Sequence, residues 1–288
     1  MKINKISCMM IFLSLCLLLG ACTSTPTAKA VKEIPKEPIR VGVIGTFTGV
    51  GAYFGEQERR GLEIAKEEIN SEGGVDGRMI MLIYEDSMAS PTQAITAANK
   101  LISADNVKYI IGDSWAITTE KIIQLTNNNK VIVISGVAML ESMSQDDYFF
   151  RTIHSTGKMA TLLADYAYND MGSRVVGTIY SATPFGEEHA RLFKEAFERL
   201  GGQVVVEERT DLAQQELRTE LLKIKHANAD TILNLHTSGL IGLAMKQAAE
   251  MNFHPKWLGS FGVQTESTIK DYKGFSEGIV YPTSMTLT

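Results

Sequence analysis

Short apolar runs alternate with amphipathic stretches from residue 39 onward, and this alternation limits the possible folds more than any other feature. The run 39–45 reads IRVGVIG, and the helical stretch 57–70 that follows it stops at a pair of glycines. Glycines at such a position supply the left-handed backbone of a helix cap. Continuous apolar strands that alternate with helices are typical of parallel sheets covered on both faces. The sequence therefore predicts an α/β fold.

The alternation occurs in two series, 39–152 and 153–280, which we expect to form two Rossmann-like α/β lobes joined by a hinge. The segment 148–155 is the expected first crossover between the lobes, and 281–288 is the expected start of a second crossover. Strands are predicted at 39–45, 79–84, 107–111 and 131–134 in the first lobe, and at 174–180, 203–208, 231–235 and 256–259 in the second.

One helix start is marked clearly in the sequence. Ser90 stands at an N-cap position, Pro91 at the first helical position, and Gln93 three residues after the serine. This is the pattern of a capping box, in which the two polar side chains bond to free backbone N–H groups. We therefore expect a helix to begin at Pro91.

Residues 1–21 have the layout of a secretory signal peptide. A short basic start precedes an apolar run over 9–19, which is shorter than the roughly 20 residues that span a bilayer. The run ends in the letters LGAC, which resemble a bacterial lipobox and imply lipidation of Cys22; an ordinary cleavage site with a chance cysteine is the alternative. Residues 22–38 are then a lipidated tether, and we expect an extracytoplasmic protein held to a membrane by its lipid alone.

Charge and cysteine usage argue against several classes of function. The chain has 28 basic and 33 acidic residues, and removal of 1–21 takes two lysines, leaving 26 against 33 and a net charge of −7. Such a chain is a poor nucleic-acid binder, because phosphate neutralisation drives that binding. Cys8 and Cys16 lie in the removed segment, and the five histidines show no pair at ligand spacing. We expect no nucleic-acid partner, no metal and no cofactor.

Four longer stretches carry a resemblance to a known family. They are IRVGVIGTFTGVGAYFGEQERRGLEIAKEEINSEGGVDGR, YEDSMASPTQAITAANKLI, ISGVA and PFGEEHARLFKEAFERLGG. In this order they resemble the type I periplasmic binding proteins, in the branched-chain amino-acid receptor branch, over residues 39–282. The resemblance implies a monomeric, non-enzymatic receptor that closes on a small ligand and delivers it to the permease subunits of an ABC importer. Members of the family continue past the point where this chain ends, so its C-terminal part is expected to be truncated.

The resemblance also implies which positions contact the ligand. The family's acid that pairs with an amino-acid ammonium falls near Phe261, and two of its hydroxyl positions fall near Ala116 and Met139. Without that acid a buried ammonium would be costly. We therefore expect an apolar or aromatic carboxylate, its anion bound by backbone N–H groups at helix starts near Ala116 and Met139. The implied ligand residues are Phe54, Trp115, Ala116, Ala138, Met139, Phe185, Thr237 (or Ser238) and Phe261.

Other functions and other roles for these residues stay open at this point. Aromatic residues where a strand meets a helix are often core residues. Residues 112–116 resemble a nucleophile elbow with Ser114 as the nucleophile, which leaves a serine hydrolase as an alternative. An extracellular ligand sensor is another, although a lipid anchor without a transmembrane helix argues against it. The glycine loop at 49–55 has the spacing G-x-G-x-x-x-G, which misses the dinucleotide pattern.

Overall fold

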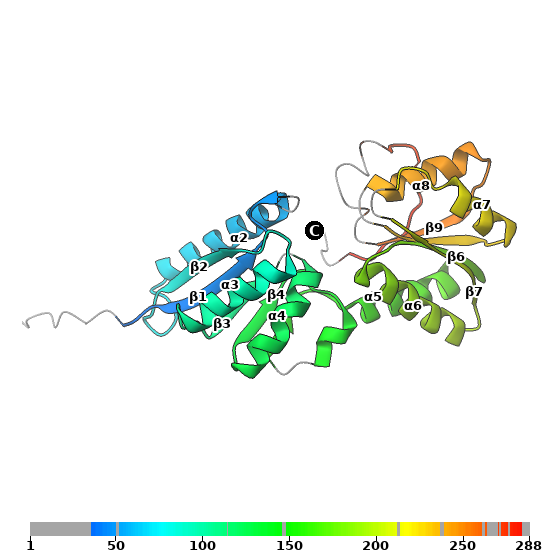
Figure 1. The fold of residues 1–288 in the computed structure, drawn as a ribbon. Helices are drawn as coiled ribbons and strands as arrows, with labels where there is room; N and C mark the ends of the chain where they lie inside the picture. Colours follow the sequence, from blue (N-terminus) through cyan, green and yellow to red (C-terminus); the bar gives the residue numbers. More distant parts are fainter. Residues whose placement is uncertain are drawn as a thin grey trace, which may run out of the picture. The chain divides into compact units, whose positions relative to one another are not determined.

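Two parallel sheets organise the chain in the computed structural model (Figure 1). The first has the strand order β2-β1-β3-β4-β5 and the second the order β7-β6-β8-β9. The structure describes residues 36–49, 52–113, 115–145, 148–211, 214–236, 239–260, 263, 270, 272–275 and 277–283.

The strands of the first sheet are β1 (Ile39–Gly45), β2 (Ile80–Asp86), β3 (Tyr109–Gly112), β4 (Ile132–Ser135) and β5 (Phe149–Arg151). Those of the second are β6 (Val175–Ser181), β7 (Gln203–Thr210), β8 (Thr231–Leu235) and β9 (Lys256–Gly259). The helices are α2 (Ala52–Ser71), α3 (Pro91–Ser103), α4 (Ala116–Asn128), α5 (Thr156–Asp165), α6 (Pro184–Arg199), α7 (Arg218–His226) and α8 (Gly239–Glu250), with short turns η2 (Glu141–Gln145) and η3 (Tyr166–Asp170).

The second sheet is covered on both faces, as its continuous apolar strands predict. In β8, Ile232 and Leu233 are neighbours in sequence and point to opposite faces, yet both are fully buried. Ile232 belongs to a core with side chains of α7 and α8, and Leu233 to a core with α5 and α6. A strand that is buried on both sides favours apolar residues, and β8 has three of them. Its two polar residues, Thr231 and Asn234, are also fully buried.

The first sheet is covered less evenly. One core packs α3 and α4 against Ile44, Ile110 and Val133 of the sheet. On α2, however, only Gly55 is fully buried, and Ile64 and Ile69 are 58% and 39% exposed. These apolar side chains of α2 therefore have only partial cover from the described residues.

Two local expectations differ from the structure. Part of the predicted crossover 148–155 is strand β5, which pairs in parallel with β4. The helix that was expected to begin at Pro91 does so, but Ser90 makes no side-chain cap bond; its carbonyl accepts instead from the N–H of Ala94. The lobe limits 39–152 and 153–280 stay predictions.

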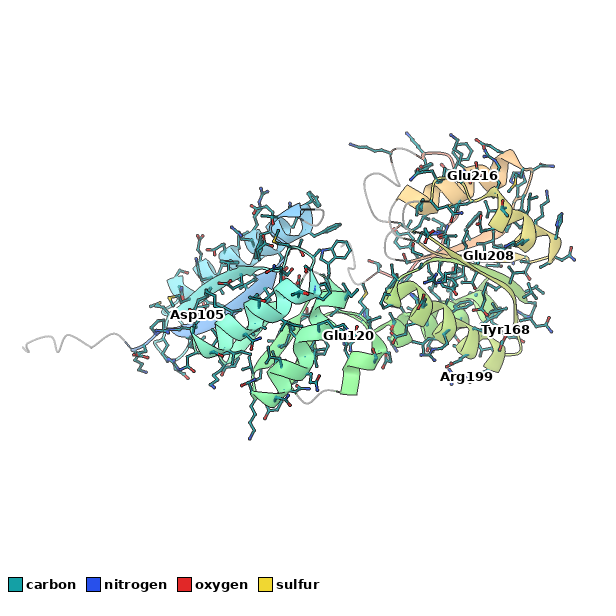
Figure 2. All side chains as sticks on the ribbon, in the orientation of Figure 1. Asp105, Glu120, Tyr168, Arg199, Glu208 and Glu216 are labelled. Atoms are coloured by element: carbon teal, nitrogen blue, oxygen red, sulfur yellow. The ribbon has the colours of Figure 1, made fainter. Side chains whose placement is uncertain are left out.

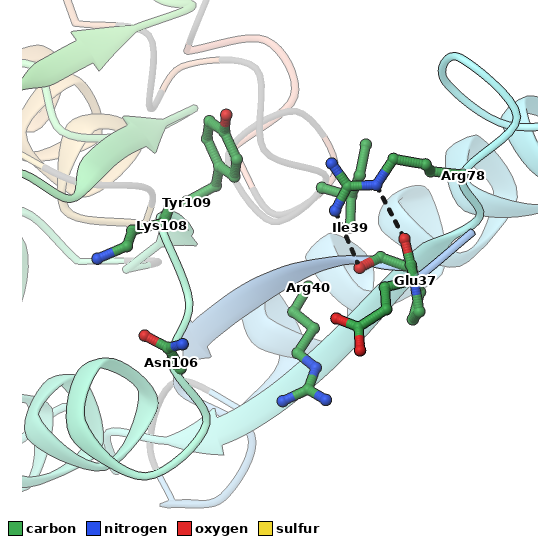
Figure 3. A pocket seen from close by; sticks show the side chains of 8 residues that line it. Glu37, Ile39, Arg40, Arg78, Asn106, Lys108 and Tyr109 are labelled. Carbon is green, nitrogen blue, oxygen red and sulfur yellow. Dashed lines mark hydrogen bonds between the residues drawn. The ribbon is translucent and has the colours of Figure 1, made fainter.

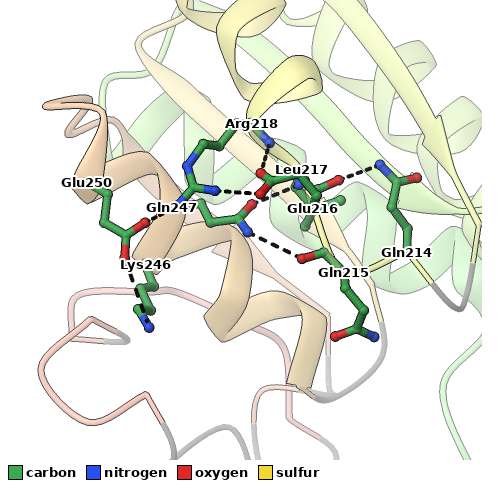
Figure 4. A network of polar contacts seen from close by, with 8 residues as sticks. All are labelled: Gln214, Gln215, Glu216, Leu217, Arg218, Lys246, Gln247 and Glu250. Atoms are coloured by element: carbon green, nitrogen blue, oxygen red, sulfur yellow. Dashed lines mark hydrogen bonds and ion pairs between the residues drawn. The ribbon is translucent and has the colours of Figure 1, made fainter.

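A polar network joins α7 to α8 (Figure 4). The Gln247 Oε1 atom accepts from the N–H of Leu217 at 2.8 Å, and its Nε2 donates to the Gln215 carbonyl at 3.4 Å. Gln247 is only 4% exposed, whereas the surrounding Arg218 and Glu250 ion pair is open to solvent. Exposed pairs contribute little, so the buried glutamine is the stronger link.

Many charged side chains lie exposed on the helices or beside their ends. Glu120 on α4, Arg199 at the end of α6 and Glu216 before α7 are examples (Figure 2). In the described part of the chain, no helix combines the length and apolarity needed to cross a membrane.

Candidate ligand site

Asp86, the last residue of β2, links two loops at the carboxyl edge of the first sheet. Its Oδ1 atom accepts from the N–H of Phe47 at 3.0 Å and of Met88 at 2.9 Å, and its Oδ2 atom accepts from the Thr48 hydroxyl at 2.6 Å. Burial alone would raise the pKa of Asp86, but these hydrogen bonds outweigh burial and lower the pKa. The loops after β1 and β2 are therefore fixed to each other at this edge.

At the same edge, the first turn of α2 packs directly against the end of β1. A Cβ atom at Gly55 would lie 2.1 Å from the carbonyl oxygen of Thr46. Only glycine permits this approach. The close contact holds the aromatic residues that precede Gly55, Tyr53 and Phe54, next to the end of β1.

Tyr53, Phe54 and Trp115 form an exposed aromatic cluster at the carboxyl edge. The ring centroids of Tyr53 and Phe54 are 5.5 Å apart and those of Phe54 and Trp115 are 6.2 Å apart, both edge to face. The three side chains are 70%, 55% and 38% exposed in that order. Aromatic residues of a core are normally buried, whereas these three rings are exposed to solvent. Their exposed faces suit contact with an apolar ligand.

Trp115 is also the N-cap residue of α4. It has an extended backbone and its side chain makes no cap bond, while its carbonyl accepts from the hydroxyls of Thr118 at 2.7 Å and Thr119 at 3.0 Å. The first turn of α4, which begins at Ala116, therefore starts at the aromatic cluster. A helix start favours negative charge through its free N–H groups and its dipole.

Ala138 and Met139, after β4, lie deeper than expected. Ala138 is fully buried in the first core and Met139 is 7% exposed. The Ser135 hydroxyl accepts from the N–H of Ala138 at 3.0 Å, and the Met139 carbonyl accepts from Arg151 at 2.8 Å. Their role in ligand binding stays a prediction.

The N–H groups that were expected to be free near Met139 are occupied, so this part of the expectation is wrong. Glu188 on α6 accepts from the N–H of Glu141 at 2.7 Å and of Ser142 at 3.3 Å, and from the Thr156 hydroxyl. A carboxylate that already sits on this helix start leaves no place for a ligand anion there. Of the two expected helix starts, only that of α4 is left as a candidate.

Phe185 lies in the first turn of α6, where Thr183 caps the helix by accepting from the N–H of Gly186 at 3.1 Å. Its ring is half-buried, packs against the first core, and meets the ring of His189 edge to face at 5.3 Å. His189 is fully buried, and burial lowers its pKa to about 4.

Polar side chains gather at the carboxyl edge of the second sheet. His236, directly after β8, lies 2.6 Å from the Thr210 hydroxyl and 2.8 Å from the Asn234 Oδ1 atom, and Ser260 donates to its carbonyl at 3.0 Å. Ser181 ends β6 beside them. Burial lowers the pKa of His236 to about 4.

Several predicted positions lie outside the described residues: the lipidation site Cys22, the hydrolase position Ser114, and the ligand positions Thr237, Ser238 and Phe261. For Ala116 the backbone is described and the side chain is not. Of the predicted ligand residues, the structure brings Phe54 and Trp115 into contact. In the described ranges, no three His, Cys, Asp or Glu side chains meet as metal ligands.

The hollow in Figure 3 is at the opposite end of the first sheet. It has a volume of about 440 Å³ and lies at the first residues of β1 and β3, among them Arg40 and Tyr109. Arg78 crosses it to donate to the carbonyls of Glu37 at 2.8 Å and Pro38 at 3.4 Å. Open α/β sheets bind ligands at the carboxyl ends of their strands, so this hollow is not the candidate site.

Comparison with known proteins identifies the family. A family model described as periplasmic binding protein matches residues 38–286. The chain belongs to the periplasmic binding protein family. The α/β fold and the resemblance that the sequence carries are thereby confirmed, since the relatives of this periplasmic binding protein include branched-chain amino-acid receptors.

Three relatives illustrate the range of this family. The Leu/Ile/Val-binding protein homolog 2 of Brucella abortus is 28% identical over 229 residues, which are 78% of this chain and 61% of that protein. A leucine binding protein from Thermotoga maritima has a TM-score of 0.75 at 23% identity, over 84% of this chain and 69% of that one. A solute binding protein of an ABC transporter from Rhodopseudomonas palustris, solved with 3,4-dihydroxybenzoic acid, has a TM-score of 0.67 at 26% identity, over 79% and 62%.

Three residues of this periplasmic binding protein were missed at the sequence level. Tyr53 stands next to Phe54, and two adjacent aromatics at a helix start were a usable signal. His236 follows directly after a predicted strand, which is the usual place of ligand residues in such folds. For Glu188, nothing in the sequence shows that its carboxylate accepts from the N–H groups of Glu141 and Ser142.

Proposed function

We propose that this chain is the ligand-capturing subunit of an ABC importer, bound to a membrane through a lipid on Cys22 and active outside the cytoplasm. It holds a small ligand between the carboxyl edges of its two sheets, closes on it by a hinge motion, and releases it unchanged. Closure follows from the ligand contacting both halves only in the closed form, which shifts the population toward that form.

The observation that carries the proposal is the exposed aromatic cluster of Tyr53, Phe54 and Trp115 beside the start of α4. The rings offer an apolar wall and the helix start offers N–H groups to an anion. Together they suit a ligand with an aromatic or aliphatic body and one carboxylate. The Rhodopseudomonas palustris relative, solved with an aromatic acid, supports this ligand class, while the leucine-binding relatives support an amino acid.

The two tryptophans of the chain allow a direct test. Trp257 is 8% exposed in a core, whereas Trp115 is 38% exposed in the cluster. In a Trp257→Phe variant, fluorescence therefore reports on Trp115 alone. We expect 3,4-dihydroxybenzoate to change this fluorescence and to raise the melting temperature, with leucine and isoleucine having little effect.

A Phe54→Ala change in the same background should weaken binding roughly tenfold, because one face of the aromatic wall is removed. Ile64→Ala, on the exposed side of the same helix, is the matched control and should leave binding unchanged. Tight binding of leucine without any response to aromatic or aliphatic acids would reject the proposed ligand class. No response to either class would reject ligand capture at this cluster.

A further inference from the structure

A row of buried polar side chains crosses the second sheet at its carboxyl edge. Ser181 on β6 is aligned with Thr210 on β7, and the pairing of Tyr180 with Leu235 places His236 next in line beside Ser181. Residues in register on neighbouring parallel strands point to the same face. Asn234, two residues before His236, shares that face too. All four side chains are at most 2% exposed.

The hydrogen bonds fix the tautomer of His236. The Asn234 Oδ1 atom accepts from the backbone N–H of His236 at 3.1 Å, which orients the amide, and lies 2.8 Å from Nδ1. An amide oxygen can only accept, so Nδ1 carries a proton. In the neutral ring Nε2 is therefore an acceptor, and the Thr210 hydroxyl donates to it at 2.6 Å.

The same heavy atoms also suit the protonated ring. The Thr210 hydroxyl lies 3.2 Å from the carbonyl of Tyr180. If this hydroxyl rotates to donate to Tyr180, its oxygen can accept from a protonated Nε2, while Nδ1 continues to donate to Asn234. Protonation of His236 thus costs no hydrogen bond and moves only one hydrogen atom. What the protonated ring lacks is a negative charge close by.

The charged neighbours do not supply that charge. Arg209 and Asp211 flank Thr210, and Tyr180 precedes Ser181, but alternation along the strands directs all three to the other face. Arg209 is paired with Glu187 at 2.8 Å. Burial is the one cause that lowers the pKa of His236, with no contribution from a charged group of the described residues.

Two polar atoms beside the ring have no partner among the described residues. They are the Ser181 Oγ atom and the Asn234 Nδ2 atom, both fully buried. Buried donors without acceptors are costly. A carboxylate is the group that would satisfy both donors and also supply the charge that the ring lacks.

We propose that His236 makes this receptor selective for anionic ligands: its ring is neutral in the free protein and takes a proton from solvent when a carboxylate binds at this edge. Ser181 and Asn234 are then the donors to the carboxylate, and Thr210 and Asn234 hold the imidazolium. This inference rests on the proposed function and specifies its ligand class, and it assigns the carboxylate to this edge of the second sheet in place of the start of α4.

Proton uptake makes the affinity depend on pH with a definite sign. Binding of the anion raises the pKa of His236, so the complex holds a proton that the free protein does not. Affinity is therefore greatest at low pH and is lost as pH rises through the pKa of the complex. Within that window the dissociation constant should increase by up to about tenfold per pH unit.

The test is calorimetric titration of the full chain with 3,4-dihydroxybenzoate, between about pH 5.5 and about pH 7.5, in buffers of different ionisation enthalpy. The dependence of the binding enthalpy on the buffer gives the number of protons taken up per ligand bound. We expect this number to approach one at the acid end of the range. His236→Gln should abolish the uptake, since its amide can still donate to Asn234 and accept from Thr210. His254→Gln, at an exposed histidine, is the matched control and should keep the uptake.

The neutral probe 3,4-dihydroxybenzamide separates this inference from the proposed function. Binding of the acid without proton uptake, or equal binding of acid and amide, overturns the role of His236 and leaves ligand capture intact. Absence of binding for both probes and for leucine overturns the proposed function, and this inference with it. Proton counting on the unaltered chain gives the result even where His236→Gln does not fold.

Discussion

At the scale of single residues, Gln247 shows what one buried side chain contributes. It accepts from the N–H of Leu217, at the start of α7, at 2.8 Å. Gln247→Leu removes this acceptor and leaves the N–H buried, so we expect the free energy of unfolding to fall by about 1–3 kcal/mol. Urea denaturation measures the change. Lys246→Ala, at the next position and exposed, should change it by less than about 0.5 kcal/mol; equal effects would contradict the role of the buried bond.

At the scale of elements, two glycines of α2 differ in their surroundings. Gly55 is required by close packing, whereas Gly61 affects only the helix propensity. A Cβ atom at Gly55 would meet the Thr46 carbonyl at 2.1 Å, whereas one at Gly61 meets nothing within 4 Å. Gly55→Ala should therefore push α2 away from β1 and lower the melting temperature. Gly61→Ala should raise the free energy of unfolding by about 0.5–1 kcal/mol, because alanine loses less backbone freedom in a helix. Stabilisation by both changes would show that the close approach is absent.

At the scale of the whole molecule, buried histidines make stability depend on pH. Burial lowers the pKa of His189 to about 4, and no hydrogen bond to its ring nitrogens is found among the described residues. The unfolded chain takes up a proton near the ordinary value of 6.5, and the folded chain does so only near 4. The free energy of unfolding should therefore be highest above about pH 6.5 and should fall as the pH approaches about 4.

His189→Met keeps roughly the volume of the side chain and removes the titrating group. We expect this variant to lose less stability than the unaltered chain between about pH 7 and about pH 5, by up to about 2 kcal/mol. Chemical denaturation at both pH values measures the difference. His254→Gln serves as the exposed control, with an unchanged pH dependence. An identical acid sensitivity in His189→Met would mean that other groups cause it.

The elements followed from the sequence where burial on both faces imposes a pattern. Ile232 and Leu233 are both apolar because both faces of β8 are covered, and this adjacent apolar pair favoured a strand that is buried on both sides. The face of α2 was less predictable, since the apolar residue Ile64 is exposed there. Periodicity tells which residues can be buried on a helix, and only the packing partners decide which of them are.

The candidate site divides in the same way. Phe54 and Trp115 could be placed at one edge because strand ends in a parallel sheet meet there. Other contacts could not be placed from the sequence. Glu188 accepts from the N–H groups of Glu141 and Ser142, which are far from it in the sequence. The ring of His236 bonds to Thr210 and Asn234, and only the register of the strands brings Thr210 beside it. By itself the sequence determined the parallel α/β architecture, because the spacing of apolar residues along the chain reflects which faces of each strand and helix are buried. Only the tertiary structure decided which polar groups are free for a ligand, because side chains that are distant in the sequence form hydrogen bonds with some of these groups and not with others.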